Sequence, residues 1–407
     1  MSSWSAELSL GFTGCISICS DQPNEIEGAK ERTMGKQTGG SGGKRVAIVL
    51  GGGGMKGFAH IGVLRALQER GIRPTVYSGT SIGALIAAAA VGRMPVEEMA
   101  RRAESLRRRD LFRINHFGML LERMRSPSIY LEEPLRDLCR SIVPALRFSD
   151  LGSQLLVNTV DITRGTQLVW GLPGLRDVWV QDAVYASCAL PGFFPPGEVG
   201  GRLCVDGGVI DNLPVAVASM EADVVIAVDV GSSDLAPTKD IVTQGFASIY
   251  MRAATTMMHA LQQYPLTRWD GVPMLLIRPK LGQDWLSFGN AAASMDEGYR
   301  KAMLALQDFD AVLEQPGGVY PRRRVTIEVD KDKCIGCGLC VALAPAVMGM
   351  DADGKAYARS RTADWSTADG DFVHHCPTCA IDVQKIERLT PSSSNPATRG
   401  PTEADAA

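Results

Sequence analysis

The residues with the clearest chemical meaning form a G-x-S-x-G pattern at residues 79–83, with Ser81 at its centre. A β-branched and aromatic run precedes the pattern at residues 75–77, and an alanine-rich helical run follows at residues 85–91. A serine on a sharp strand-to-helix turn is held clear of the backbone, and flanking glycines leave room for neighbouring segments. The helix that follows directs free N–H groups and its positive dipole end toward charge that develops near the serine. This arrangement is typical of a serine nucleophile, although so short a pattern also arises by chance.

A second glycine-rich turn lies upstream, between a continuous apolar run at residues 46–50 and a helical stretch at residues 58–70. Its glycines satisfy G-x-G-x-x-G, but no acidic residue follows about 20 positions later, where a dinucleotide site would need one. The P-loop pattern fails too, because Met55 and Gly57 stand where it requires a glycine and a Ser or Thr. What remains is a row of backbone N–H groups at a helix N-terminus. Such a row, close to a serine nucleophile, indicates an oxyanion hole.

The serine also needs a base, which must come from elsewhere in the chain. His60 lies among apolar residues on the first predicted helix, and we interpret it as a packed side chain. Asp206 is a better candidate, because it ends an apolar run at residues 203–205 and precedes Gly207 and Gly208. A carboxylate at a strand end beside two glycines can approach another backbone closely. The alternative is an aspartate that stabilises a tight turn.

Taken together, these motifs resemble those of the patatin-like phospholipases. The quoted motifs are G-G-G-x-K-G at residues 52–57, G-x-S-x-G at 79–83, A-S-C-A-L-P-G-F-F-P-P at 186–196, D-G-G at 206–208 and D-N-L-P at 211–214. The resemblance covers roughly residues 44–310. It implies a hydrolase that cleaves lipid esters, of the phospholipase or lysophospholipase type, and that needs no cofactor for hydrolysis.

The resemblance also implies a role for each site residue. Ser81 is the nucleophile and Asp206 the general base of a Ser/Asp dyad. The oxyanion hole is formed by the backbone N–H groups of Gly52, Gly53 and Gly54.

The rest of this region indicates the fold class. Strand-like runs at residues 223–230 and 274–277 alternate with helical stretches at residues 241–263 and 296–313. Such alternation predicts an α/β fold, here a patatin-like, mostly parallel sheet flanked by helices. We expect this acyl hydrolase domain to span residues 44–314.

Residues 101–125 carry eight arginines interleaved with apolar side chains. Basic and apolar residues mixed at helical spacing fit a surface that rests on anionic lipid. The alternative is a solvated helix whose apolar side packs on the core. The expectation of a lipid substrate favours peripheral contact with an anionic membrane.

A separate group of cysteines lies near the C-terminus. Cys334, Cys337 and Cys340 form C-x₂-C-x₂-C, and Cys376 stands before a proline. Three thiolates on one tight loop with a fourth before a proline suit an iron–sulfur cluster, whereas zinc sites more usually pair two C-x₂-C knuckles. This stretch resembles a single-cluster, bacterial-type ferredoxin, which implies a small α+β domain over residues 324–387. Four ligands favour one [4Fe-4S] cluster, while a [3Fe-4S] form stays open, and Cys379 falls outside the pattern.

The remaining segments complete the predicted organisation. Residues 1–43 read as a flexible leader, residues 315–323 as a linker and residues 388–407 as a disordered tail. The net charge of −3 does not suggest a nucleic-acid partner. No apolar run approaches the roughly 20 residues that span a bilayer, and no secretory signal is evident. We therefore expect a cytoplasmic protein that contacts the inner face of the membrane peripherally.

Two functions follow from this organisation. The first is a serine-dependent lipid acyl hydrolase whose cluster domain senses redox state, docks or exchanges electrons with a redox partner protein. The alternative is a redox-responsive electron carrier or lipid-binding interaction protein, in which the patatin-like domain is not catalytic. The intact serine, aspartate and glycine loop favour the hydrolase.

Overall fold

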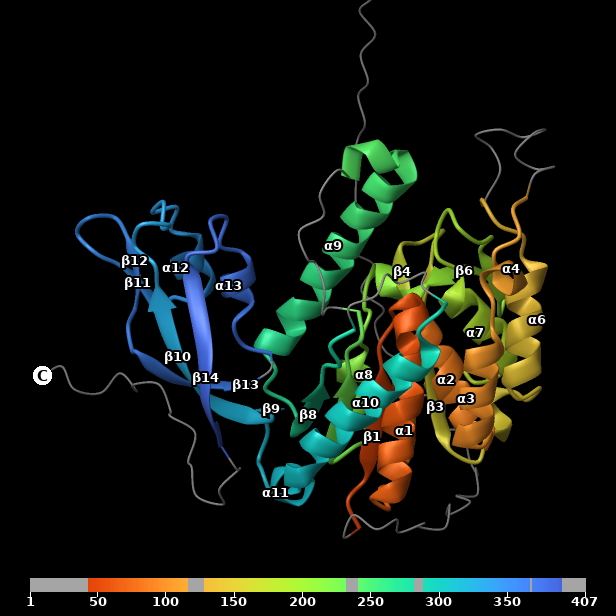
Figure 1. The fold of residues 1–407 in the computed structure, drawn as a ribbon. Coiled ribbons are helices and arrows are strands. Elements are labelled where there is room, and N and C mark those ends of the chain that lie inside the picture. The colour runs from red at the N-terminus through yellow and green to blue at the C-terminus, as the bar shows by residue number, and fades with distance from the viewer. Residues whose placement is uncertain (1–42, 116–127, 232–240, 282–287, 367, 390–407) are drawn as a thin grey trace, which may run out of the picture. The chain divides into compact units, whose positions relative to one another are not determined.

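The computed structural model describes residues 43–115, 128–231, 241–281, 288–366 and 368–389. These residues build a nine-stranded sheet with its helices and, after it, two small sheets near the C-terminus (Figure 1). The strands of the large sheet are β1 (Val46–Leu50), β2 (Val76–Thr80), β3 (Gln154–Asp161), β4 (Thr166–Trp170), β5 (Gly197–Val199), β6 (Arg202–Asp206), β7 (Val224–Val228), β8 (Met274–Ile277) and β9 (Val319–Tyr320).

Helices connect these strands. They are α1 (Ala59–Glu69), α2 (Ile82–Val91), α3 (Val96–Ser105), α4 (Arg108–Leu111), α6 (Glu133–Ile142), α7 (Val180–Cys188), α8 (Val215–Ser219), α9 (Phe246–Thr267), α10 (Ala291–Ala305) and α11 (Phe309–Leu313). The short 3₁₀ helix η1 (Gly54–Phe58) is separated from the end of β1 by three residues, and η4 (Gly207–Val209) follows β6 directly. Among the residues placed in the structure, no helix is long and apolar enough to cross a membrane.

The strand order is β5-β6-β3-β2-β1-β7-β8-β9, with β4 paired to β3 outside this path. The pairs from β3 through β2, β1, β7 and β8 to β9 are all parallel, whereas β4, β5 and β6 pair in antiparallel fashion. The mostly parallel sheet that the sequence predicts is therefore confirmed. Strand β9 lies within the segment that we expected to link the two domains.

The central strand β1 shows why this sheet needs helices on both faces. Val46, Ile48 and Leu50 belong to one hydrophobic core, which includes side chains of α1, α2, α7 and α10. The alternating residues Ala47 and Val49 belong to a second core, which includes side chains of α8. Because neighbouring side chains of a strand point to opposite faces, a fully apolar strand must be covered on both sides. Because both faces of the sheet are covered, the edge at the carboxyl ends of β1 and β2 is the part of these strands that remains accessible.

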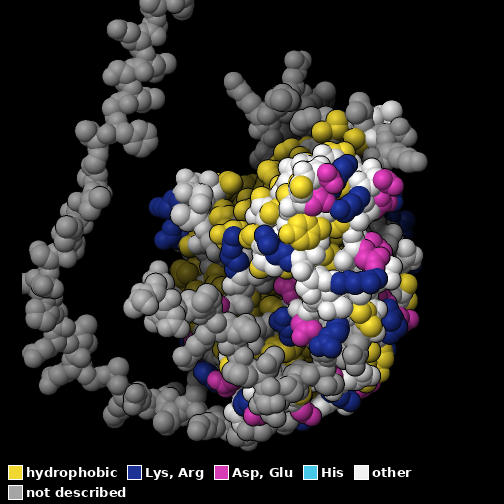
Figure 2. All heavy atoms as spheres, turned by 90° about the vertical axis from the view of Figure 1, so that its left-hand side faces the viewer, with side chains coloured by type: hydrophobic (Ala, Val, Ile, Leu, Met, Phe, Trp, Pro, Cys, Tyr) yellow, Lys and Arg dark blue, Asp and Glu magenta, His cyan; other side chains and the backbone are white. Residues whose placement is uncertain are grey.

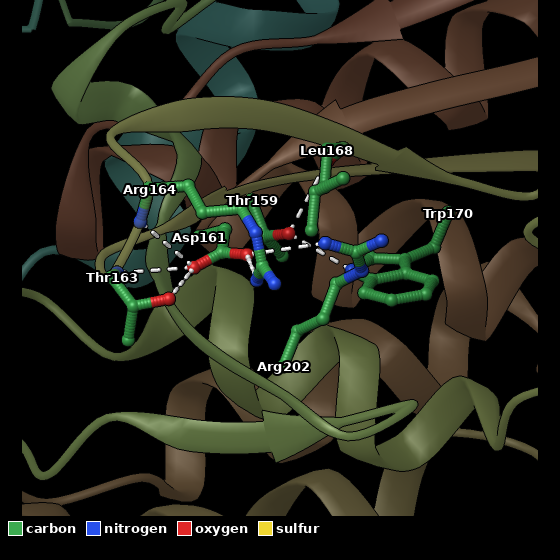
Figure 3. Close-up of polar contacts among 7 residues, drawn as sticks. All are labelled: Thr159, Asp161, Thr163, Arg164, Leu168, Trp170 and Arg202. Carbon is green, nitrogen blue, oxygen red and sulfur yellow. Dashed lines mark hydrogen bonds and ion pairs between the residues drawn. The ribbon is translucent and has the colours of Figure 1, made fainter.

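A buried carboxylate fixes the antiparallel part of the sheet. Asp161, at the end of β3, accepts hydrogen bonds from the hydroxyl and the N–H of Thr163, at 2.6 and 3.0 Å, and from the Arg164 guanidinium at 2.8 Å (Figure 3). Arg202, on β6, donates to the same carboxylate at 3.3 Å. These hydrogen bonds, that of the Thr163 hydroxyl foremost, hold the pKa of Asp161 well below its usual range. The turn after β3 is thereby tied to the strand that ends at Asp206.

The C-terminal residues form a small, strand-rich domain. Its elements are β10 (Arg322–Val329), α12 (Leu339–Leu343), β11 (Met348–Met350), β12 (Ala356–Ala358), β13 (Thr362–Ser366), α13 (Asp371–His374) and β14 (Ile381–Leu389). Strand β10 lies between β13 and β14 in an antiparallel sheet, and β11 pairs with β12. A separate core that includes Ile327, Met348 and Trp365 holds these elements together. The expected α+β architecture is confirmed.

Candidate functional site

Ser81 lies in the turn between β2 and α2, with φ 56° and ψ −129°. A non-glycine residue with positive φ is strained and persists only where its surroundings enforce the conformation. Close packing of the backbone provides that constraint. A Cβ added to Gly83 would lie 2.0 Å from the carbonyl oxygen of Leu50, and one added to Gly79 would lie 2.5 Å from the carbonyl carbon of Gly83. Both flanking positions of the G-x-S-x-G pattern therefore require glycine.

Asp206 reaches Ser81 from the end of β6. Its carboxylate accepts the N–H of Gly208 at 2.8 Å and is only 3% exposed. Burial raises the pKa of Asp206 to about 6, while the hydrogen bond from the Gly208 N–H and the neighbouring Ser81 hydroxyl lower it in part. The structure thus brings the predicted serine and aspartate close to each other. A carboxylate with a pKa close to neutrality can take a proton and return it.

Two polar residues that sequence reasoning missed hold this pair in place. Ser187, on α7, accepts the N–H of Ser81 at 2.9 Å and donates its hydroxyl to the carbonyl of Asn158 at 2.7 Å. Asn158, on β3, donates its side-chain N–H₂ to the carbonyls of Asp211 at 2.6 Å and Gly207 at 3.2 Å. One asparagine and one serine therefore connect the turn after β2 to the turn after β6. The available sequence signals were the polar pair Asn158 and Thr159 between apolar residues of one strand, and the serine of the A-S-C-A-L-P motif.

The glycine loop after β1 differs in part from the expected arrangement. The N–H of Gly52 donates to the carbonyl of Asn212 at 3.1 Å, so it is committed to the fold. Gly53 and Gly54 line the same cavity as Ser81, and their N–H groups remain candidates for an oxyanion hole. His60 lies behind the loop, where its Nε2 is 2.8 Å from the carbonyl oxygen of Gly51. Burial lowers the pKa of His60 to about 4, so a neutral, packed ring supports the loop.

Ser81 and Asp206 open onto a cavity of about 880 Å³. Much of its apolar wall comes from α2, α3 and α6. These lining side chains include Ile86, Ala89, Met99, Ala103, Leu135 and Leu138. A cavity lined mainly by apolar side chains together with some polar groups is the usual form of a small-molecule site.

The basic and apolar segment that we expected at a membrane is described as far as residue 115, and residues 116–125 lie outside the described residues. Within the described part, Arg107, Arg109 and Arg113 are exposed. Leu111, by contrast, is buried and lines the cavity, and the exposed side chain of Arg108 lines it too. Apolar and basic residues of this segment therefore meet at the cavity.

In the small domain, Cys334, Cys337, Cys340 and Cys376 all line one small cavity, whereas Cys379 is not among its lining residues. Backbone N–H groups point at two of the sulfurs, from Ala356 to Cys334 at 3.4 Å and from Ala380 to Cys376 at 3.3 Å. Within the described ranges, no three His, Cys, Asp or Glu side chains lie close enough to share one metal ion. An iron–sulfur cluster does not need three side chains around one metal ion, because each of its thiolate ligands binds a different iron. The four thiols and the N–H donors fit an iron–sulfur cluster.

The surroundings of these cysteines favour a thiolate at one position. Burial raises the pKa of Cys376, but backbone N–H donors of Ala380 and Thr378 outweigh it and lower the pKa overall. Ile335, Leu339 and Leu343 are exposed large hydrophobic residues, and the first two also line the cavity. Figure 2 views the molecule from the left of Figure 1, and hydrophobic side chains gather on that face among separate basic and acidic ones.

Comparison with known proteins assigns both domains. Residues 48–219 match the family model of patatin-like phospholipases, and residues 327–383 match that of a 4Fe-4S single cluster domain. The chain therefore contains a patatin-like phospholipase domain followed by a 4Fe-4S single cluster domain, and the fusion that the sequence motifs suggested is confirmed.

Individual relatives match the first domain. An uncharacterized NTE family protein of Mycobacterium tuberculosis is 37% identical over 203 residues, which are 49% of this chain and 53% of that protein. Lysophospholipase nte1 of Emericella nidulans is 36% identical over 196 residues, 47% of this chain and 12% of that protein. The chain thus spans about half or less of the length of these relatives. Among solved structures, VipD from Legionella pneumophila is 18% identical, with a TM-score of 0.35 over 65% of this chain and 67% of that one.

The hydrogen bonds of Ser187 generate a prediction about stability. Ser187→Ala would leave the Ser81 N–H without its acceptor and the Asn158 carbonyl without its donor, both in the interior. We expect the free energy of unfolding, measured in urea, to fall by about 1–3 kcal/mol. Ser141→Ala is the matched control, because Ser141 is exposed on α6 and the hydrogen bond that its hydroxyl donates stays within that helix. Equal effects of the two substitutions would show that Ser187 does not hold the turn.

Proposed function

We propose that the patatin-like domain hydrolyses a lipid ester with Ser81 as nucleophile and Asp206 as general base. The observation that carries this proposal is a buried carboxylate, with its pKa raised to about 6, next to a strained serine in the wall of a mostly apolar cavity. A binding-only domain has no need of this combination. The proposal therefore favours the hydrolase over the electron carrier or lipid-binding protein that the sequence left open.

The reaction proceeds in two steps through these groups. Ser81 Oγ attacks the ester carbonyl carbon while Asp206 accepts the hydroxyl proton and then passes it to the departing alcohol. Water next attacks the acyl-enzyme in the same way and releases a fatty acid. In this proposal the N–H groups of Gly53 and Gly54, which line the cavity, stabilise the oxyanion, and the N-terminus of α2 adds its dipole. No cofactor takes part in this chemistry.

The cavity indicates which part of a lipid it would hold. Its wall from α2, α3 and α6 suits an acyl chain, because most of the side chains that these helices contribute are apolar. The name of the fungal relative, a lysophospholipase, supports a substrate with a phosphate-containing head group. Exposed Arg107, Arg108 and Arg109 suit an anionic membrane surface at the same place. We propose phospholipids or lysophospholipids as substrates, reached by peripheral contact.

For the second domain we propose one [4Fe-4S] cluster held by Cys334, Cys337, Cys340 and Cys376. When bound, the cluster supplies one-electron redox chemistry. Its proposed role is redox sensing, docking or electron transfer, and the exposed Ile335, Leu339 and Leu343 suit contact with a redox partner protein. Hydrolysis itself consumes no electrons, so the cluster would act on the hydrolase through structure or recruitment.

The central experiment compares the protein with Ser81→Ala. We expect fatty acid release from phosphatidylcholine, phosphatidylglycerol and their lysolipids, followed by mass spectrometry, to drop by on the order of 10⁴-fold or more in the variant. A fluorophosphonate probe should label the unmodified protein but not the variant. Ser219→Ala, which removes a serine hydroxyl bonded within α8, serves as the control and should release fatty acid normally. Inert wild-type protein with no labelling would favour the non-catalytic alternative.

A second prediction concerns pH. Asp206 must be ionised to accept the proton, and its pKa is raised to about 6, so activity should be lost as the pH falls through that value. We expect kcat/KM to rise with pH to half of its plateau near pH 6. Asp211→Asn should leave the midpoint in place, although burial raises the pKa of Asp211 too. A midpoint near the ordinary aspartate value of about 4, or one that moves in Asp211→Asn, would contradict the role of Asp206.

A third prediction concerns the cluster. Protein purified without oxygen should contain about four irons per chain, and Cys376→Ala should lose most of the iron and the visible absorbance of the cluster. Cys379→Ala is the matched control, because Cys379 lies three residues away but does not line the cavity. Full iron content in Cys376→Ala, or loss in Cys379→Ala, would refute the proposed ligand set.

A further inference from the structure

Two buried amide side chains lie in the cavity wall beside the catalytic pair, and the mechanism above does not use them. Asn212 follows η4 and is 5% exposed, and Gln262 lies on α9 and is 3% exposed. Both line the cavity together with Ser81 and Asp206.

Hydrogen bonds fix the orientation of both amides. The Nδ2 of Asn212 donates to the carbonyl of Gly52 at 3.1 Å and to Oε1 of Gln262 at 3.1 Å. A backbone carbonyl can only accept, so the Asn212 atom that faces Gly52 must be nitrogen, and Oδ1 must point elsewhere. Because Asn212 Nδ2 donates, the Gln262 atom that it contacts must be Oε1, and Nε2 is the other polar atom of that amide.

These constraints leave one acceptor and one donor unused. Among the described residues, neither Oδ1 of Asn212 nor Nε2 of Gln262 has a hydrogen-bond partner. Buried polar atoms are nearly always paired, so each such atom calls for an explanation. Two of them on hydrogen-bonded neighbours, both in the wall of one cavity, point to a ligand that the cavity receives.

The acceptor lies close to both catalytic side chains. A Cβ added to Gly208 would lie 2.9 Å from Asn212 Oδ1 and 3.1 Å from Asp206 Oδ1. A Cβ added to Gly52 would lie 2.3 Å from Asn212 Oδ1 and 3.2 Å from Ser81 Cβ. Glycine at both positions therefore opens the space around the amide oxygen, next to the base on one side and the nucleophile on the other.

We propose that Asn212 and Gln262 bind a hydroxyl group beside Asp206. A hydroxyl is the smallest group that donates to one amide oxygen and accepts from one amide N–H. Two molecules can supply this hydroxyl. One is the water that hydrolyses the acyl-enzyme, and the other is a lysolipid, through its free glycerol hydroxyl. This inference rests on the proposed hydrolase function and extends it to the group that the site holds in place.

The hydrolytic step shows what such binding would accomplish. Water forms a new bond from its oxygen to the acyl carbon, its proton passes to Asp206, and the bond between Ser81 Oγ and the acyl carbon breaks. The proton then moves from Asp206 to Ser81 Oγ, which restores the enzyme and releases the fatty acid. Asn212 and Gln262 act here as positioning residues, because they orient the hydroxyl and exchange no proton.

The test uses the full chain, a p-nitrophenyl acyl ester and a lysophosphatidylcholine. The variants are Asn212→Ala and Gln262→Met, and the second leaves the contact between Asn212 and Gly52 intact. Gln263→Met is the matched control, because Gln263 is the next residue of α9, is equally buried and instead bonds to Arg278. Three quantities are measured for each protein: the initial burst of nitrophenol, the steady-state turnover rate and the mass of the intact protein.

If water is the bound hydroxyl, both variants keep the burst but lose turnover by about tenfold or more on both substrates, and the acyl-enzyme appears in the mass spectrum. If the lysolipid hydroxyl is bound, turnover of the p-nitrophenyl ester stays unchanged while kcat/KM for the lysolipid falls by a similar factor. Either result supports the proposal.

The proposal is overturned if the variants match Gln263→Met, or if burst and turnover fall together without acyl-enzyme, because both amides would then be structural. Wild-type protein that neither turns over substrate nor reacts with a fluorophosphonate would instead overturn the proposed hydrolase, and this inference with it.

Discussion

The close approach of backbones at the carboxyl end of β1 is the constraint on which the site depends. Gly83 lies so near the carbonyl of Leu50 that no side chain fits between them, and Gly79 lies equally near Gly83. Helix α2 can therefore start only after a sharp turn, and Ser81 takes a positive φ within that turn. The energy that this strain costs is offset by the apolar contacts of β1, β2 and α2 in one continuous core.

The same packing sets the electrostatics of the site. Asp206 is taken out of water by the elements that bring it to Ser81, so its burial and its position have one cause. A solvated aspartate would be too weak a base for a serine. Burial raises its pKa, whereas the hydrogen bond from the Gly208 N–H lowers it in part and so favours the charged form. Structure and reactivity are thus coupled through desolvation.

Local patterns predicted the parts of this structure that local physics determines. The apolar runs at β1 and β8, the G-x-S-x-G turn and the C-x₂-C-x₂-C loop each depend on a few consecutive residues, and the structure has all of them. Contacts between distant segments were out of reach. The Gly52 N–H donates to the Asn212 carbonyl, and the Asn158 side chain donates to the Gly207 carbonyl. Both hydrogen bonds depend on which strands become neighbours. No spacing in the sequence encodes that choice.

The hydrogen bond from the N–H of Ser81 to the hydroxyl of Ser187 joins residues that are 106 positions apart in the chain. Such a contact forms only after the intervening segment has closed into a loop, and loop closure of this length delays folding. Ser81 and Asp206 therefore meet only when β3 has paired with both β2 and β6. A chain in which these pairs have not formed holds the two residues apart, so the candidate site exists only with the completed sheet.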